Sequence, residues 1–285
     1  MRRGVNFTTI FWLFSLSVGL SGVANSQDAA LSGYEPPRFR AEADGVLPAL
    51  PPETTIRLLA DADFAPFSFL SASGAPAGLA VELAMAACAE AKLRCKVEVK
   101  PFGEILPALQ NGEADVAVTG PRLEDAALRQ SLMTRPYFRT MGRFAVQTGN
   151  PLTAADPRSL EDKRIGVVKD TVHARWLEAY YGDSEIIVFD DAVAAGEALR
   201  LGTIDTLFGD NLGLIYWVSG ATARGCCRLL GSAFSDFDYF SRNLAFLVRR
   251  DRGELRQAFD HGLDMAQKRG VTARIIKAYV PLNPW

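Results

Sequence analysis

The sequence predicts an α/β protein made of two similar units with a ligand cleft between them. In the first half of the chain short apolar strands alternate with helices, and the same alternation returns in the second half. Such alternation is typical of a parallel sheet with crossover connections. Open sheets of this kind bind ligands beyond the carboxyl ends of their strands. A third observation, an export signal at the amino terminus, indicates that both units act outside the cytoplasm.

The amino terminus has the three parts of a cleavable signal peptide. Arg2 and Arg3 form a positive region, Ile10–Leu20 is apolar and uncharged, and Ala24-Asn25-Ser26 supplies small residues for cleavage. The apolar run is shorter than the roughly 20 residues of a membrane-spanning helix, which disfavours the alternative of an uncleaved anchor. Residues 1–26 are therefore predicted to be removed, and the mature protein is predicted to be soluble in the periplasm.

The composition indicates a globular protein without a nucleic-acid partner. Hydrophobic residues make up 48% of the 285 positions, enough for a large core in each unit. The net charge is −2, with 31 basic and 33 acidic residues, and no clustered basic excess is present. Residues 27–54 carry neither helical nor strand periodicity, and they predict an extended lead-in that is rich in proline (Pro36, Pro37, Pro48, Pro51 and Pro52).

The first unit begins with an apolar segment, Ile56–Ala60, that is too short for a helix and predicts a buried strand. Apolar residues then recur at helical spacing over Leu79–Ala91. A strand at Val97–Val99 follows, and a short helix over Ile105–Leu109 ends at an Asn-Gly pair. Val116–Val118 is fully apolar and predicts the next strand of the sheet.

The second unit repeats this order. Arg164–Val168 predicts a strand, and a helix follows through Trp176. A second strand is expected at Glu185–Phe189 and a helix over Ala192–Leu201, which ends at a glycine. Thr206–Phe208 then predicts the next strand of the second sheet.

Export allows the four cysteines to form disulfides. Cys88 and Cys95 are seven residues apart, a spacing that can close a helix-to-strand turn. Cys226 and Cys227 are adjacent, and either a vicinal disulfide or two separate or reduced thiols fits the sequence. Neither histidine lies at ligand spacing from the cysteines, so no metal site is expected.

Several segments resemble the bacterial periplasmic amino-acid-binding proteins, the histidine and lysine-arginine-ornithine binders among them. The resemblance follows the family's order through about four fifths of the chain. It is carried by Phe64-Ala65-Pro66-Phe67, Gly78–Ala84, Phe102–Leu109, Gly112–Asp115, Thr134-Arg135-Pro136-Tyr137, Leu160–Val167 and Gly202–Asp210.

This resemblance implies the type II periplasmic binding protein fold, with two lobes joined by two crossover hinge segments. Lobe 1 would comprise residues 55–139 and 240–285, and lobe 2 residues 140–239. The lobes would close on a small polar ligand, an amino acid, and a monomeric protein would deliver it to the permease of an ABC importer. The resemblance also implies a Cys88–Cys95 disulfide, and it implies no cofactor.

The family's site implies roles for four residues. Asp210 matches the carboxylate that receives the ligand's ammonium, although an aspartate after a strand is also a favoured helix cap. Phe64 and Phe102 match apolar walls of the site, with core packing as the alternative. Asp61 matches an acid that meets basic ligand side chains, and its alternative is a solvated turn acid.

Two chain segments would bind the ligand's carboxylate. Thr119 and Gly120 end a strand of lobe 1, and Lys169 and Thr171 precede a helix of lobe 2 whose amino terminus offers N–H groups to an anion. The family usually has Gly-Thr-Thr at that helix start, and this chain does not. His173 fits either a ligand contact or a structural role at the helix start.

The family's carboxylate clamp, an arginine, is absent. Its position holds Ala127, and Arg122 and Arg129 lie nearby. Arg122 follows the strand end at Thr119-Gly120, so we expect its guanidinium to replace the missing clamp. The alternatives are a surface arginine that pairs with a neighbouring acid, or a ligand without a carboxylate.

Two other functions fit the same superfamily. Thr134–Arg139 is similar to proteins associated with quinoprotein methanol dehydrogenases, and a few members of the fold are cyclohexadienyl dehydratases. An enzyme would need a paired acid and base in the cleft. Asp61, Asp170 and Asp210 are the acids available there, and no catalytic motif accompanies them. We therefore expect a binding protein and not an enzyme.

Overall fold

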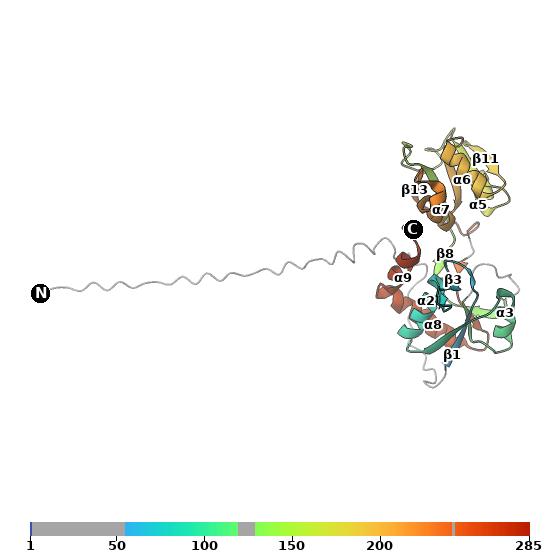
Figure 1. Ribbon diagram of the computed structural model, residues 1–285, viewed down its shortest axis with the longest axis vertical. Helices are drawn as coiled ribbons and strands as arrows, with labels where there is room; N and C mark the ends of the chain where they lie inside the picture. The colour runs from blue at the N-terminus through green and yellow to red at the C-terminus, as the bar shows by residue number, and fades with distance from the viewer. Residues whose placement is uncertain (2–54, 119–128, 241–242) are drawn as a thin grey trace.

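The computed structural model describes Met1 and residues 55–118, 129–240 and 243–285. Over these residues the chain forms two α/β lobes, one above the other in Figure 1. The predicted two-lobed architecture is therefore confirmed. The predicted signal peptide and lead-in, apart from Met1, lie outside the described residues.

The sheet of lobe 1 has the strand order β5-β1-β6-β15-β7. β1 is parallel to β5 and β6, as the predicted crossover connections require. β15 is antiparallel to β6, so a segment from the end of the chain completes the sheet of the first lobe. The strands are β1 (Thr55–Ala60), β5 (Arg94–Val99), β6 (Val116–Val118), β7 (Ser131–Met133) and β15 (Leu247–Arg249).

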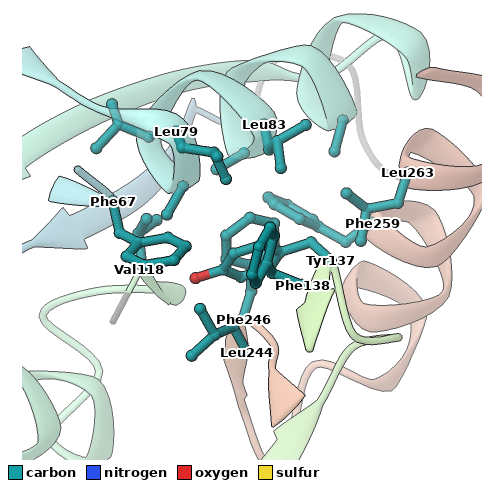
Figure 2. Packing of buried hydrophobic residues seen from close by; sticks show 14 of the residues in the cluster. Phe67, Leu79, Leu83, Val118, Tyr137, Phe138, Leu244, Phe246, Phe259 and Leu263 are labelled. Atoms are coloured by element: carbon teal, nitrogen blue, oxygen red, sulfur yellow. The ribbon is translucent and has the colours of Figure 1, made fainter. Parts of the chain in front are cut away.

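Helices from the early part of the chain and from its carboxy-terminal part pack together in the core of lobe 1. Gly262 allows α8 to approach α2 closely, because a Cβ at this position would lie 2.1 Å from the carbonyl oxygen of Ala87. Figure 2 shows Phe138 and Phe246 in the core between α2 and α8. The helices are α2 (Leu79–Glu90), α3 (Phe102–Gln110), α8 (Gly253–Lys268) and α9 (Val271–Tyr279).

The sheet of lobe 2 has the order β11-β10-β12-β9-β13 and repeats the plan of lobe 1. β10 is parallel to β11 and β12, and β9 and β13 add an antiparallel edge. The strands are β9 (Gly142–Gln147), β10 (Arg164–Val168), β11 (Glu185–Phe189), β12 (Thr206–Asp210) and β13 (Cys227–Phe234). The helices are α5 (Val172–Tyr180), α6 (Ala192–Leu201), α7 (Asn211–Ser219) and the 3₁₀ turn η2 (Ala221–Ala223).

Two strands mark the crossings between the lobes. β8 (Phe138–Arg139) leads toward lobe 2, and β14 (Asn243–Leu244) leads back and pairs with β8 in antiparallel orientation. Figure 1 shows β8 at the junction of the lobes. A small separate sheet in lobe 1 joins β2 (Asp63–Phe64), β3 (Ser68–Leu70) and β4 (Pro76–Ala77).

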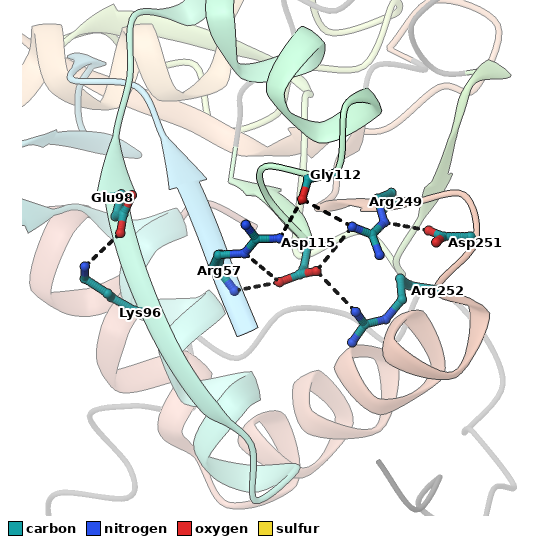
Figure 3. A network of polar contacts seen from close by, with 8 residues as sticks. All are labelled: Arg57, Lys96, Glu98, Gly112, Asp115, Arg249, Asp251 and Arg252. Atoms are coloured by element: carbon teal, nitrogen blue, oxygen red, sulfur yellow. Dashed lines mark hydrogen bonds and ion pairs between the residues drawn. The ribbon is translucent and has the colours of Figure 1, made fainter. Parts of the chain in front are cut away.

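A buried acid fixes the start of the parallel strands in lobe 1. Asp115 immediately precedes β6, and its carboxylate accepts the backbone N–H of Arg57 at 2.9 Å. The Arg252 guanidinium donates to the same carboxylate at 3.2 Å, and Arg249 lies 3.7 Å from it. Figure 3 shows this network around Asp115, whose side chain is 4% exposed.

Lobe 2 contains the equivalent arrangement. Asp205 immediately precedes β12, and its carboxylate accepts the backbone N–H of Arg164 at 2.9 Å. The Arg164 guanidinium adds contacts of 2.8 and 3.1 Å to the two carboxylate oxygens. The Gly-x-x-Asp segments identified in the sequence are therefore structural pins at the amino ends of the strands, away from the carboxyl ends where a ligand is expected.

All four cysteines are bonded in the structure. Cys88 and Cys95 form a disulfide with their Cα atoms 6.3 Å apart, which joins α2 to β5 and confirms the expected pairing. Cys226 and Cys227 are bonded to each other, so the vicinal disulfide is the alternative that the structure adopts.

Candidate functional site

Asp210 ends β12 and begins α7 in lobe 2. One carboxylate oxygen caps the helix by accepting the backbone N–H of Gly213 at 2.8 Å. The side chain remains accessible to solvent, while the protein around it removes enough water to raise the pKa of its carboxyl group above the ordinary value. The carboxylate also accepts a backbone hydrogen bond from Leu212, and its exposed side leaves the negative charge accessible to a cation from the solvent.

His173 lies beside Asp210 near the start of α5. Its ring stacks on Phe240 with centroids 5.2 Å apart and meets the edge of Phe208 at 5.7 Å. Burial lowers the pKa of the imidazole, although the charge of Asp210 and a hydrogen bond to the Met141 backbone oppose this shift. Burial thus favours the uncharged form of the imidazole beside Asp210.

Asp210 and His173 both line a pocket of about 370 Å³ at the carboxyl ends of β10 and β12. This is the position where an open parallel sheet binds its ligands. Most of the wall is apolar, and neither lysine nor arginine is among the described residues that form it. The lining residues are Val167, Val168, Thr171, His173, Ala192, Ala195, Leu207, Phe208, Gly209, Asp210, Gly213, Leu214 and Trp217.

Thr171 and Lys169 differ in their relation to this pocket. Thr171 lines it, but its hydroxyl caps α5 by accepting the N–H of Ala174 at 3.1 Å and donating to the Val168 carbonyl at 2.8 Å. Lys169 does not line the pocket and pairs with Asp190 at 2.7 Å on the exposed surface. The structure thus brings Thr171 and Asp210 together and directs Lys169 toward a surface acid.

The three candidates of lobe 1 lie on other elements and are not part of this pocket. Asp61 follows β1 and is 2% exposed, so it is not a solvated turn acid. Phe64 is half-buried and stacks on the core residue Phe67 with centroids 5.1 Å apart. Phe102 is the first residue of α3 and keeps part of its side chain exposed. Phe64 and Phe102 therefore both have surface left for a contact.

Four positions of the predicted site lie outside the described residues: Thr119, Gly120, Arg122 and Ala127. The expected strand-end contacts and the expected replacement clamp stay predictions.

The sequence analysis missed most of the pocket wall. Ala192 comes from the start of α6, and Trp217 comes from the second turn of α7. Neither residue belongs to a motif, and only the folded arrangement of the two helices places them together. His173 was recognised as a candidate and lies beside Asp210 in the pocket lining, and its contact with a ligand stays a prediction.

Within residues 55–118, 129–240 and 243–285, no group of three histidine, cysteine or acidic side chains is arranged to hold a metal ion. Nor does this part of the chain contain a helix long and apolar enough to cross a membrane.

Comparison with known proteins places these features in a wider group. The model of the bacterial extracellular solute-binding proteins, family 3, matches residues 56–281. The chain is similar to the L-arginine-binding protein of Pseudomonas aeruginosa, with 25% identity over 82% of this chain and 90% of the relative. It is also similar to two Escherichia coli proteins. One is ABC transporter arginine-binding protein 1, at 24% identity over 77% of this chain and 88% of the relative. The other is the lysine/arginine/ornithine-binding periplasmic protein, at 22% identity over 80% and 88%.

Solved structures share the fold. The second substrate-binding domain of Lactococcus lactis GlnP, in its open conformation, aligns with a TM-score of 0.66 and 22% identity over 82% of this chain and 98% of that domain. An ancestral cyclohexadienyl dehydratase aligns with a TM-score of 0.67 and 15% identity over 80% of this chain and 93% of the enzyme. At these identities the likeness extends to the fold alone.

Proposed function

Because this chain belongs to family 3 of the bacterial extracellular solute-binding proteins, we propose that it captures an amino acid between its two lobes and delivers it to an ABC importer. The ammonium group of the ligand binds the Asp210 carboxylate. Closure of the lobes then brings the walls of lobe 1 into contact with the rest of the ligand. Phe64 and Phe102, which keep exposed surface, are the lobe 1 walls in this proposal.

The observation that carries the proposal is an accessible carboxylate in a largely apolar pocket. Asp210 lines this pocket, burial favours the uncharged form of its neighbour His173 by lowering the pKa of the imidazole, and neither lysine nor arginine lines the pocket among residues 55–118, 129–240 and 243–285. An ammonium ion that leaves water needs an anionic partner, and a charge-assisted hydrogen bond to a carboxylate is a strong one. The pocket therefore suits a primary amine and disfavours a free anion.

The names of the relatives support an amino acid as that amine and an importer as the partner. Two relatives are named for arginine and a third for lysine, arginine and ornithine, and one is named as a periplasmic protein. Arginine is thus the first ligand to test, and the periplasm is the proposed location.

Binding without catalysis is the proposed activity. The relatives that cover most of the chain are named as binding proteins, whereas the likeness to a cyclohexadienyl dehydratase is limited to the fold. A dehydratase would also need an acid and a base placed on one substrate. Among the described residues that line the lobe 2 pocket, Asp210 is the only carboxylate.

A calorimetric screen of the twenty amino acids and ornithine against the exported protein tests this function. We expect one or a few amino acids to bind. Bound ligand at 100 times its Kd would stabilise the protein by about 2.7 kcal/mol, so a thermal-shift screen gives an independent readout. Aromatisation of prephenate or arogenate by the protein, in the absence of amino-acid binding, would contradict the proposal.

Arg122 remains our candidate for the carboxylate clamp. A guanidinium holds a carboxylate through two parallel hydrogen bonds, and lysine keeps the charge but loses this geometry. We predict that Arg122→Lys weakens binding of the best amino acid at least tenfold, and that Arg129→Lys leaves it within twofold of wild type. Unchanged affinity in both Arg122→Lys and Arg122→Ala would exclude Arg122 as the clamp.

A further inference from the structure

The pocket of lobe 2 is larger than an ammonium group requires. Its volume of about 370 Å³ lies within the range of small-molecule sites, and it extends from Asp210 to the space between the first turn of α6 and α7. We name this inner part the α6–α7 chamber, and its walls are Val168, Ala192, Ala195, Leu214 and Trp217. Every one of these walls is an apolar side chain.

Small residues keep the chamber open. Ala192 and Ala195 present only methyl groups from α6, and Gly213 presents no side chain from α7. The opposite wall is held by Gly196, where a Cβ would lie 2.9 Å from the indole of Trp217. The absence of a side chain at Gly196 thus lets the Trp217 indole pack directly against α6. Ala192 and Ala195 of the same helix leave the open space of the chamber beside the indole.

The charges around the chamber define the chemistry of its occupant. The acidic residue of the lining is Asp210, and Thr171 and His173 are its other polar residues. A molecule with its cation at Asp210 would therefore place an apolar group inside, where only hydrocarbon and indole surfaces surround it.

We propose that the α6–α7 chamber holds an apolar group of the ligand and selects amines that carry an aliphatic or aromatic substituent. This inference rests on the proposed function, because it assumes that Asp210 binds the ligand's ammonium. It goes beyond that function by assigning the apolar selectivity to lobe 2. Burial of a leucine-sized or phenylalanine-sized group there would tighten binding about 10- to 100-fold relative to a methyl group.

Two substitutions in the first turn of α6 test the chamber. Ala192 and Ala194 are both exposed on this turn, but only Ala192 lines the chamber. Ala192→Leu would fill the space without entering the core, and Ala194→Leu is the matched control with the same added volume and helix position. Equal melting temperatures of the two variants would show that both fold.

The probes are L-alanine, L-leucine, L-phenylalanine and phenethylamine, titrated calorimetrically into the exported protein. We expect wild type and Ala194→Leu to bind leucine or phenylalanine at least tenfold more tightly than alanine. Ala192→Leu should reduce this preference to about twofold or less. Equal affinities of wild type for the amino acids, or equal preferences in the two variants, would overturn the chamber proposal.

Further outcomes separate this inference from the proposed function. Amino acids that bind without an apolar preference would support the function and overturn the chamber. Phenethylamine binding that Ala192→Leu abolishes, with no amino-acid binding, would support the chamber and overturn the amino-acid function. If none of the four probes binds wild type, the chamber proposal is overturned.

Discussion

At the scale of single residues, Asp210 combines a structural role with the binding role that we propose. Its carboxylate caps α7 through the N–H of Gly213, and the same group faces the pocket. The cap and ligand roles that the sequence left as alternatives are therefore compatible. The surroundings raise the pKa of the carboxyl group, which means that the unliganded protein holds the charge at a cost. A cation from the ligand would remove that cost.

Because the charged Asp210 carboxylate destabilises the unliganded protein, we predict that Asp210→Asn stabilises this protein at neutral pH. Asparagine caps helices about as well as aspartate, so the substitution removes the charge and keeps the cap. Because the folded-state pKa is raised, the charged carboxyl destabilises the fold above that pKa, and the penalty disappears as the pH falls through it. We expect a modestly higher urea midpoint at pH 7 and no gain near pH 3. A lower midpoint at pH 7 would contradict this account.

Residue roles were only partly predictable from the sequence. The place of Asp210 followed from its position after a strand and from the family resemblance, and the structure puts it at a pocket. The burial of Asp61 did not follow, because a single acid after a strand carries no sign of its surroundings in the sequence. The walls Ala192 and Trp217 carry no motif, since a pocket wall needs only small or apolar side chains.

At the scale of elements, each lobe is organised by the same pin. Asp115 precedes β6 and Asp205 precedes β12, and each carboxylate accepts a backbone N–H of the neighbouring strand. The periodic strands and helices between these pins were predictable. β9 was not, because this nearly fully buried strand shows no polar alternation and contains Arg143. The Arg143 guanidinium donates to the Gly231 carbonyl, a partner that only the tertiary fold supplies.

We predict that Asp115→Ala destabilises the fold by about 3–5 kcal/mol, because removal of a buried acid leaves its arginine partners without their counterion. The pin lies at the amino ends of the strands, so ligand affinity of the folded fraction should stay within about threefold of wild type. Glu113→Ala is the control, since Glu113 is exposed and pairs only with Lys100 at 3.1 Å among the contacts of the described residues. Urea denaturation and calorimetry measure both properties. A loss of less than 1 kcal/mol in Asp115→Ala would contradict the pin's structural role.

At the scale of the whole molecule, the carboxy-terminal segment after α9 joins the lobes beside the two crossing strands. The Asn283 carbonyl accepts a hydrogen bond from Arg143 of β9 at 2.9 Å, and the Pro284 carbonyl accepts one from Asn211 of α7 at 2.6 Å. The Trp285 ring lies 5.3 Å from that of Phe138 in β8. Figure 1 shows the carboxy terminus at the junction of the lobes. Sequence periodicity could not predict this link, because backbone carbonyls make most of its contacts.

Deletion of residues 283–285 should loosen the junction. Loss of two hydrogen bonds and of part of an indole contact is expected to cost about 2–4 kcal/mol of stability. Amide hydrogen exchange in β8 and β14 should accelerate, while exchange in the two central sheets changes little. Leu282→Ala is the control within the same segment, because Leu282 is exposed. Unchanged exchange in β8 and β14 would show that the segment does not couple the lobes.

The central claim is that the Asp210 carboxylate binds the ammonium of an amino acid, and one calorimetric comparison tests it most directly. The best ligand of the screen is titrated into wild type, Asp210→Asn and Asp191→Asn. Asp191 caps α6 as Asp210 caps α7, with its oxygen 2.8 Å from the N–H of Ala194, but it lies outside the pocket. Loss of one partner of a desolvated charge pair costs about 2–5 kcal/mol, so we predict at least about 30-fold weaker binding for Asp210→Asn and unchanged binding for Asp191→Asn. Equal affinities in all three proteins would contradict the claim.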